Sequence, residues 1–209
     1  MPYLNIKPMK RIRFLAFMAL LPVSVSLTGQ PEFGAGVKGG INFATQVTPG
    51  SGEGVAVQQL LGFNAGGYCS LFFNDFLAIQ PELMISTRGS DWDDATYDVS
   101  DLLTYIDLPL FLRYQPIKYV NIHAGPQFGY LLSARQKDDQ TDDITDINDW
   151  YNKLDVGLAF GLEANLPYRI NLTVRYVLGL VSATNDVQYI EPWKNNFFQL
   201  SLGFRIVGD

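Results

Sequence analysis

Apolar and polar residues alternate along most of the chain after residue 30, in one segment after another. Alternation with a period of two is typical of a β-strand that has one apolar face. The clearest segment sets Leu154, Val156, Leu158, Phe160, Leu162, Ala164 and Leu166 against Lys153, Asp155, Glu163 and Asn165. Eight such segments predict eight strands, near residues 37–47, 57–73, 77–88, 105–113, 120–133, 153–166, 170–178 and 198–205.

The alternating positions form two sets, which we call the polar parity and the aliphatic parity. The residue composition of these two sets distinguishes a membrane barrel from a soluble one. The polar parity combines charges of both signs with glycines, namely Gly62, Gly66, Gly125, Gly129, Gly157 and Gly161. The aliphatic parity is nearly free of charge along each segment, as a lipid-facing band requires. Eight strands also could not enclose so many large side chains if that parity faced inward. The pattern therefore predicts lipid outside the barrel and a polar interior.

The links between the segments alternate between long and short. Long polar links lie near residues 48–56, 90–102, 136–152 and 183–194, and short ones lie at 74–75, 115–118 and 167–169. This order places all long links at one end and both termini at the other, as in bacterial outer-membrane barrels. Pairing of the first and last strands leaves no open edge in lipid. We therefore expect an all-β fold, an eight-stranded antiparallel up-and-down transmembrane β-barrel.

The first 29 residues have the three-part layout of a secretory signal peptide. Basic residues come first, at Lys7, Lys10, Arg11 and Arg13, followed by an apolar core over 14–21 and small residues at Ser24, Ser26, Thr28 and Gly29. The alternatives are an N-terminal membrane anchor and a buried helix, but the apolar run is too short to span a bilayer comfortably. We therefore predict a signal peptide at 1–29 and an outer-membrane β-barrel domain at 30–209.

Overall charge and cysteine content narrow the function classes. The formal net charge is −6, which argues against nucleic acid as a partner, because phosphate binding needs a basic surface. Cys69 is the single cysteine, so an intramolecular disulfide or a Cys-rich metal cluster is excluded.

Three prolines lie inside predicted strands, at Pro81, Pro109 and Pro126. Each removes a hydrogen bond from the strand ladder. The predicted barrel therefore requires bulges or local breaks at these positions.

Several short motifs occur in a characteristic order. They are Gly36-Val37-Lys38-Gly39-Gly40-Ile41-Asn42, Gln80-Pro81-Glu82-Leu83, Ile106-Asp107-Leu108-Pro109-Leu110 with Arg113-Tyr114, and Ala124-Gly125-Pro126 leading into Gly129-Tyr130-Leu131-Leu132-Ser133-Ala134. With these motifs the chain resembles the PorT-like, or porin-family, outer-membrane β-barrel proteins. The three strand prolines, Pro81, Pro109 and Pro126, are part of these motifs. The resemblance implies an eight-stranded barrel in the bacterial cell outer membrane. The founding member is linked to a secretion system for surface proteins, and no catalytic residues come with the family. One departure is that Phe204 is followed by five further residues rather than ending the chain.

The charges on the polar parity admit two interpretations. They are Lys38, Arg88, Arg113, Lys153, Arg175 and Arg205 beside Glu82, Asp107, Asp155 and Glu163. Inside a narrow barrel such charges must be paired or hydrated. They could line a polar conduit for a small solute or form ion pairs that fill the interior. Eight strands leave room only for side chains, so we expect a filled interior.

The remaining candidates for chemistry are weak. The long links carry acidic clusters, at Asp91, Asp93, Asp94, Asp98 and Asp101 and at Asp138, Asp139, Asp142, Asp143, Asp146 and Asp149. Calcium could bind clustered carboxylates, but the spacing lacks the EF-hand order, and we expect solvated loops. His123 is the only histidine, and its parity predicts an interior side chain beside Gln127 and Ser133 rather than a catalytic base. We therefore assign no catalytic, metal-binding or cofactor-binding residue.

These observations predict a non-enzymatic outer-membrane barrel with a structural or partner-binding role, for example in secretion or envelope assembly. The alternatives are a narrow channel for small solutes and an outer-membrane lipid-modifying enzyme. Expected partners are outer-membrane lipid and a protein of an envelope or secretion complex, with no nucleic acid and a monomeric barrel. Barrels of this architecture serve many functions, so fold alone does not select one.

Overall fold

A computed structural model describes residues 32–47, 60–94, 97–138, 141–185 and 193–208. The predicted signal peptide, the link at 48–56 and part of the link at 183–194 lie outside the described residues. Within the described ranges the elements are β1 (Phe33–Val47), β2 (Leu60–Phe72), β3 (Leu77–Asp94), β4 (Tyr97–Ile117), β5 (Val120–Asp138), β6 (Ile144–Asp146), β7 (Leu154–Asn165), β8 (Ile170–Gly179) and β9 (Lys194–Val207), with short 3₁₀ turns η1 (Asn148–Trp150) and η2 (Pro167–Arg169). No helix in these ranges is long and apolar enough to cross a membrane.

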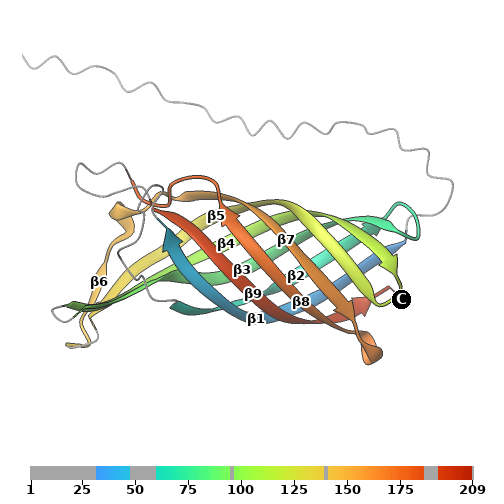
Figure 1. Cartoon of the computed structure of the whole chain (residues 1–209), viewed down its shortest axis with the longest axis horizontal. Coiled ribbons are helices and arrows are strands. Elements are labelled where there is room, and N and C mark those ends of the chain that lie inside the picture. Colours follow the sequence, from blue (N-terminus) through green and yellow to red (C-terminus); the bar gives the residue numbers. More distant parts are fainter. Residues whose placement is uncertain (1–31, 48–59, 95–96, 139–140, 186–192, 209) are drawn as a thin grey trace, which may run out of the picture.

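The strands close into a barrel (Figure 1). Consecutive barrel strands pair antiparallel, and β1 pairs with β9 from Ala35 to Val47. The short strand β6 pairs only with β5 and stands outside the ring. Eight strands therefore form the closed wall, which confirms the predicted fold class. Closure matters in lipid because no water is present there to satisfy an unpaired strand edge.

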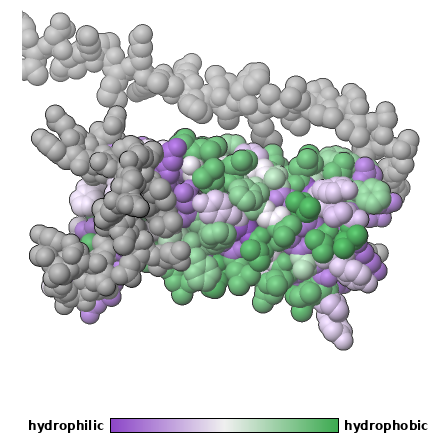
Figure 2. All heavy atoms as spheres, viewed as in Figure 1, coloured by the Kyte–Doolittle hydropathy of each residue, from purple (hydrophilic) through white to green (hydrophobic). Residues whose placement is uncertain are grey.

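Side-chain parity in the barrel follows the alternation in the sequence. The outward parity of β4 is apolar and exposed, with Leu108 at 50% and Leu112 at 56%. The inward parity of the same strand carries Asp107 and Arg113, both almost fully buried. Figure 2 shows hydrophobic residues gathered over the middle of the barrel and hydrophilic ones toward its ends. The prediction of an apolar exterior around a polar interior is confirmed.

The short turns and the C-terminus share one end of the barrel, which lies on the right in Figure 1, while β6 lies at the other end. We call these the turn end and the loop end. The prediction of a long link at 90–102 is wrong over most of that range, because β3 and β4 pair as far as Asp94 and Tyr97. This part of the hairpin is polar on both faces, so its sequence shows no apolar alternation. Beyond the membrane neither face of a strand needs to be apolar.

A β-bulge changes the predicted parity near the loop end of β5. Thr104 pairs with Ser133 and Tyr105 pairs with Leu131, so Leu132 is an extra residue on β5. The inward parity consequently passes to Ala134, which is fully buried, whereas Ser133 is half-buried. The prediction that Ser133 shares the inward parity of His123 is therefore wrong. One inserted residue reverses every later position on a strand.

The strand prolines lie beside local breaks in the ladders. Pairing of β2 with β3 is interrupted between Tyr68 and Leu71, opposite Pro81. Pairing of β4 with β5 is interrupted between Pro109 and Leu112. These breaks accommodate residues that have no N–H to donate, as the sequence required.

Replacing a lipid-facing residue near the middle of a strand should destabilise the barrel in lipid. We expect Leu108→Arg to lower the free energy of unfolding by about 2–4 kcal/mol, the cost of an arginine at the bilayer midplane. Leu108→Ala is the matched control, because it removes the same side chain without adding charge. Reversible guanidinium unfolding in lipid vesicles measures both. Equal stability of the two variants would show that position 108 does not face lipid.

Candidate functional site

The interior near the turn end is filled by a set of charges that we call the turn-side network, made of Lys38, Glu82, Arg113, Glu163 and Arg175. Lys38 Nζ lies 3.2 Å from Glu82 Oε1 and 3.1 Å from Glu163 Oε2. Arg175 donates to both carboxylate oxygens of Glu82, each at 3.0 Å. Arg113 Nη2 lies 3.2 Å from Glu163 Oε1. The five residues come from β1, β3, β4, β7 and β8, so the network joins the barrel across its width.

Neutral polar side chains complete the hydrogen bonding of this network. Gln80 donates to Glu82 at 2.9 Å, and Thr173 donates to Glu163 at 3.1 Å. Arg175 also donates to Gln199 at 3.0 Å and to Nε2 of His123 at 3.2 Å. The two carboxylates are therefore shared among several donors, which a buried carboxylate requires.

His123 lies inside the barrel, as predicted from its parity, and is almost fully buried. Its Nε2 accepts the hydrogen bond from Arg175, and its ring forms a T-shaped pair with the Phe111 ring, with centroids 4.9 Å apart. Ser133 is ten positions further along the same strand. The structure therefore brings His123 to Arg175 and does not bring it to Ser133.

A second set of charges, the loop-side network, consists of Arg88, Asp107 and Asp155 with Tyr105 and Asn195. Arg88 Nη2 lies 3.1 Å from a carboxylate oxygen of each aspartate. The guanidinium carbon lies 3.8 Å from the centroid of the Tyr105 ring, within cation–π range. Asn195 donates to Asp155 at 3.1 Å.

Glycines on the inward parity make room for these long side chains. A Cβ added at Gly129 would lie 2.6 Å from Arg88 Nη2 and 2.8 Å from Asp107 Oδ1. A Cβ at Gly161 would lie 2.9 Å from His123 Nε2. Both glycines were predicted on the polar parity, and the structure shows that they leave space for the charged groups.

Beyond the loop-side network the interior becomes apolar. A buried cluster there contains Leu103, Tyr105, Leu131, Ala134, Ile147, Tyr151 and Ala183. Tyr151 donates its hydroxyl to Asp101 at 2.8 Å, and Gln136 donates to the same carboxylate at 2.9 Å. The segment around η1 is held against β5, because Ala134 N–H donates to Asn148 at 2.8 Å. Ile147 and Tyr151 of this link thus pack into the loop end of the barrel.

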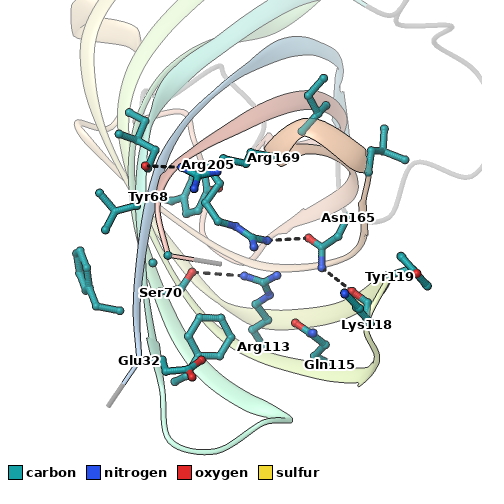
Figure 3. A pocket seen from close by; sticks show the side chains of 18 of the residues that line it. Glu32, Tyr68, Ser70, Arg113, Gln115, Lys118, Tyr119, Asn165, Arg169 and Arg205 are labelled. Atoms are coloured by element: carbon teal, nitrogen blue, oxygen red, sulfur yellow. Dashed lines mark hydrogen bonds between the residues drawn. The ribbon is translucent and has the colours of Figure 1, made fainter. Parts of the chain in front are cut away.

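The turn end, in contrast, is hollowed by a cavity of about 1000 Å³, which we call the turn-end cavity (Figure 3). Its polar lining includes Tyr68, Ser70, Arg113, Asn165 and Arg205. Arg205 Nη2 donates to Asn165 at 3.2 Å, and Asn165 donates to the backbone carbonyl of Lys118 at 3.1 Å. Arg113 is the member of the turn-side network that lines this cavity.

Most of the predicted interior charges lie where the alternation placed them. Eight are buried in the two networks: Lys38, Glu82, Arg88, Asp107, Arg113, Asp155, Glu163 and Arg175. Arg205 instead lines the turn-end cavity. The prediction for Lys153 is wrong, because this residue is exposed and precedes β7. Alternation alone does not mark where a strand begins.

The acidic links do not form a recognisable metal site in the part of the chain that the structure describes, where no group of three or more His, Cys, Asp or Glu side chains could hold an ion. Asp142 pairs with Lys137 at 3.1 Å, with both side chains exposed. Asp146 accepts two hydrogen bonds from the Asn148 side-chain amide. The side chains of Asp93, Asp94, Asp98 and Asp139 lie outside the described residues, so solvated loops stay a prediction.

Removing one charge from the turn-side network should destabilise the barrel strongly. We expect Glu82→Gln to cost about 3–5 kcal/mol, because Arg175 and Lys38 then lose a buried partner. The change keeps the side-chain volume, so lost packing cannot explain the effect. Lys137→Ala in the exposed pair with Asp142 is the control and should cost less than about 1 kcal/mol. Guanidinium unfolding in vesicles compares the two, and a similar small loss in both would contradict the network's structural role.

Comparison with known proteins gives a consistent result. The family model described as "Outer membrane protein beta-barrel domain" matches residues 28–185. Among solved structures the chain is similar to Ail, the attachment invasion locus protein of Yersinia pestis, with a TM-score of 0.51 and 14% identity over 84% of this chain and 99% of that one. It is also similar to OprG from Pseudomonas aeruginosa, with a TM-score of 0.45 and 11% identity over 85% and 98%. No curated protein sequence matches the chain.

The family match covers most of the chain, and the closed wall with its apolar exterior agrees with it. At 14% identity the likeness to Ail supports the fold alone. The chain therefore belongs to the outer membrane protein β-barrel domain family and is a β-barrel of the bacterial outer membrane.

Proposed function

We propose that this chain is a non-enzymatic, non-conducting barrel that acts by binding another envelope protein at its turn end. The observation that carries the proposal is the filled interior, in which two ionic networks lie one after the other along the barrel axis. Every charged member of both networks is almost fully buried. A solute crossing the barrel would have to separate these pairs.

The energetic cost of separating the pairs supports a structural role for the interior. Leaving a buried charge without its partner costs about 3–5 kcal/mol, and the turn-side network shares its charges, so one displacement disturbs several pairs. Lys38, for example, contacts both Glu82 and Glu163. The networks join strands that are distant along the chain and hold the wall together.

The surroundings of His123 support a non-enzymatic function. A general base needs a free nitrogen within hydrogen-bond reach of a substrate. Here Nε2 already accepts a hydrogen bond from the Arg175 guanidinium, and the ring is almost fully buried.

The ends of the barrel are the surfaces left for a partner. The resemblance to PorT-like proteins supports a partner in secretion or envelope assembly, on motifs such as Gln80-Pro81-Glu82-Leu83. At the turn end, the cavity and the projecting η2 turn are accessible, and Tyr168 of that turn is 89% exposed. A barrel that is filled across its middle can hold a partner without passing solutes.

Planar-bilayer recording tests the non-conducting part of the proposal. We expect no discrete conductance steps after insertion of the full chain, because the networks occupy the interior. A general diffusion porin added afterwards to the same membrane verifies that single channels are resolved. If the chain itself gives steps whose ion selectivity changes in Lys38→Met, the interior conducts and the channel alternative is correct.

Gentle detergent extraction from outer membranes tests the partner-binding part. We expect a stoichiometric protein to co-purify with the chain and to be lost when the turn-end tip is changed by Tyr168→Ala together with Arg169→Ala. A loop-end variant, Ile144→Ala, is the matched control, since that side chain is also exposed. A clean monomer after extraction by several mild detergents would contradict the proposal.

A further inference from the structure

We infer that the turn-end cavity binds a carboxylate group of a peptide chain that enters from the periplasmic side, an inference that rests on the proposed partner-binding function. The cavity lies inside the wall at the end that carries the short turns. In outer-membrane barrels the short turns face the periplasm. A ligand in the cavity would therefore come from that compartment.

Two of the three side-chain nitrogens of Arg113 have no hydrogen-bond partner. Its Nη1 donates to Gln80 at 3.1 Å and to Ser70 at 3.4 Å. Its Nε and Nη2 are buried without a hydrogen bond, although Nη2 lies 3.2 Å from Glu163 as an ion pair. Buried donors left unpaired are costly. In a planar guanidinium, Nε and Nη2 form one edge of two parallel N–H groups, a geometry that matches a carboxylate. Both atoms are buried, so the Arg113 side chain has to turn toward the cavity to present this edge to a ligand.

The charged residues that line the cavity are mainly basic. Its lining contains Arg113, Lys118, Arg169 and Arg205 against Glu32 and Asp75. The lining therefore has four basic and two acidic residues in a chain whose net charge is −6, and Glu163, which lies outside the lining, pairs with Arg113. Figure 3 shows Arg205 and Arg113 extending into the same space from opposite parts of the wall. An anion between two guanidinium groups would be attracted by both and would reduce their mutual repulsion.

Two features hold the wall of the cavity in shape. The ring of Tyr68 lies over β1 at Gly36, where a Cβ would come within 2.6 Å of the Tyr68 hydroxyl. That hydroxyl accepts a hydrogen bond from Asn171 at 3.0 Å. On the other side, Asn165 fixes Arg205 and is itself bonded to the carbonyl of Lys118. Arg205 is therefore positioned by a contact that exists before a ligand arrives.

Size and access select a peptide over a simple ion or a lipid. A volume of about 1000 Å³ lies at the upper end of that found for small-molecule sites and far exceeds one carboxylate. Apolar and aromatic side chains, including Phe33, Phe72 and Tyr119, share the lining. The closed wall separates the cavity from the surrounding lipid, since β1 and β9 pair along their length. A peptide end offers both a carboxylate for the arginines and side chains for the aromatic surface.

Fluorescence anisotropy with the full chain, purified from outer membranes in detergent micelles, tests the inference. The probe is a labelled pentapeptide containing Asp and Glu with a free carboxyl terminus. The comparison peptide has the same length, with Asn and Gln in place of the acids and an amidated end. We expect saturable, salt-sensitive binding of the acidic peptide and at least about tenfold weaker binding of the neutral one, since hydrogen bonds to charged groups contribute this much or more. Equal binding of the two peptides, or none of the acidic peptide, would overturn the inference.

Variants then locate the binding. We expect Arg205→Ala to weaken binding of the acidic peptide by about tenfold and Arg205→Lys by less, because lysine keeps the charge and loses the two-pronged geometry. Arg205 is only partly buried, so its variants should fold, whereas Arg113→Gln disturbs the turn-side network as well. Lys137→Ala removes an exposed cation at the loop end and should leave binding unchanged. Loss of affinity in the Lys137 variant equal to that in Arg205→Ala would indicate nonspecific attraction and overturn the inference.

Competition distinguishes the sources of the anion. Inorganic phosphate at the peptide's own concentration should not displace the probe, and neither should vesicles that contain phosphatidylglycerol. Displacement by either at that concentration would identify a site for a small anion or a lipid headgroup instead of a peptide. Co-purification separates this inference from the proposed function. A partner retained equally by Arg205→Ala would refute the cavity as its binding site and leave the partner-binding function standing.

Discussion

Everything in this molecule depends on the requirement that backbone N–H and C=O groups inside a lipid bilayer find partners within the protein. A sheet meets it only by closing, and here β1 and β9 close the ring. Eight strands make a narrow barrel whose interior must be filled by side chains. The outward side chains are apolar because they face lipid. The inward side chains therefore have to fill the barrel interior and also carry the polar and charged groups.

Inside the barrel each buried carboxylate of the turn-side network contacts two cationic side chains. Glu82 accepts from Lys38 and Arg175, and Glu163 faces Lys38 and Arg113. Buried ion pairs give little net stability compared with an apolar core, but removal of one member is costly. Such networks therefore specify one arrangement of the strands. Glycines opposite the long side chains, such as Gly129 beside Arg88, are part of the same solution because they provide the space.

Period-two alternation was sufficient to predict the strands, the outward parity and most interior charges, since lipid imposes a strict rule on each spanning residue. The predictions were wrong where that rule no longer applies. The hairpin from Asp91 to Ser100 pairs outside the apolar band, so its polar residues resembled a loop. The bulge at Leu132 reversed the parity of Ser133, and a single inserted residue leaves no compositional trace. The turn-end cavity combines residues from several strands, such as Tyr68 and Arg205, and only the register brings them together.

The chain forms a closed barrel that is inserted in the outer membrane and held by its interior ion pairs. Gel electrophoresis of isolated outer membranes, with and without boiling in detergent, tests this claim most directly. A closed barrel resists unfolding by detergent alone, so we expect the chain in this fraction, with an unboiled band that migrates faster than its boiled band. Identical migration of the two bands, or recovery of the chain in the soluble periplasmic fraction, would contradict it.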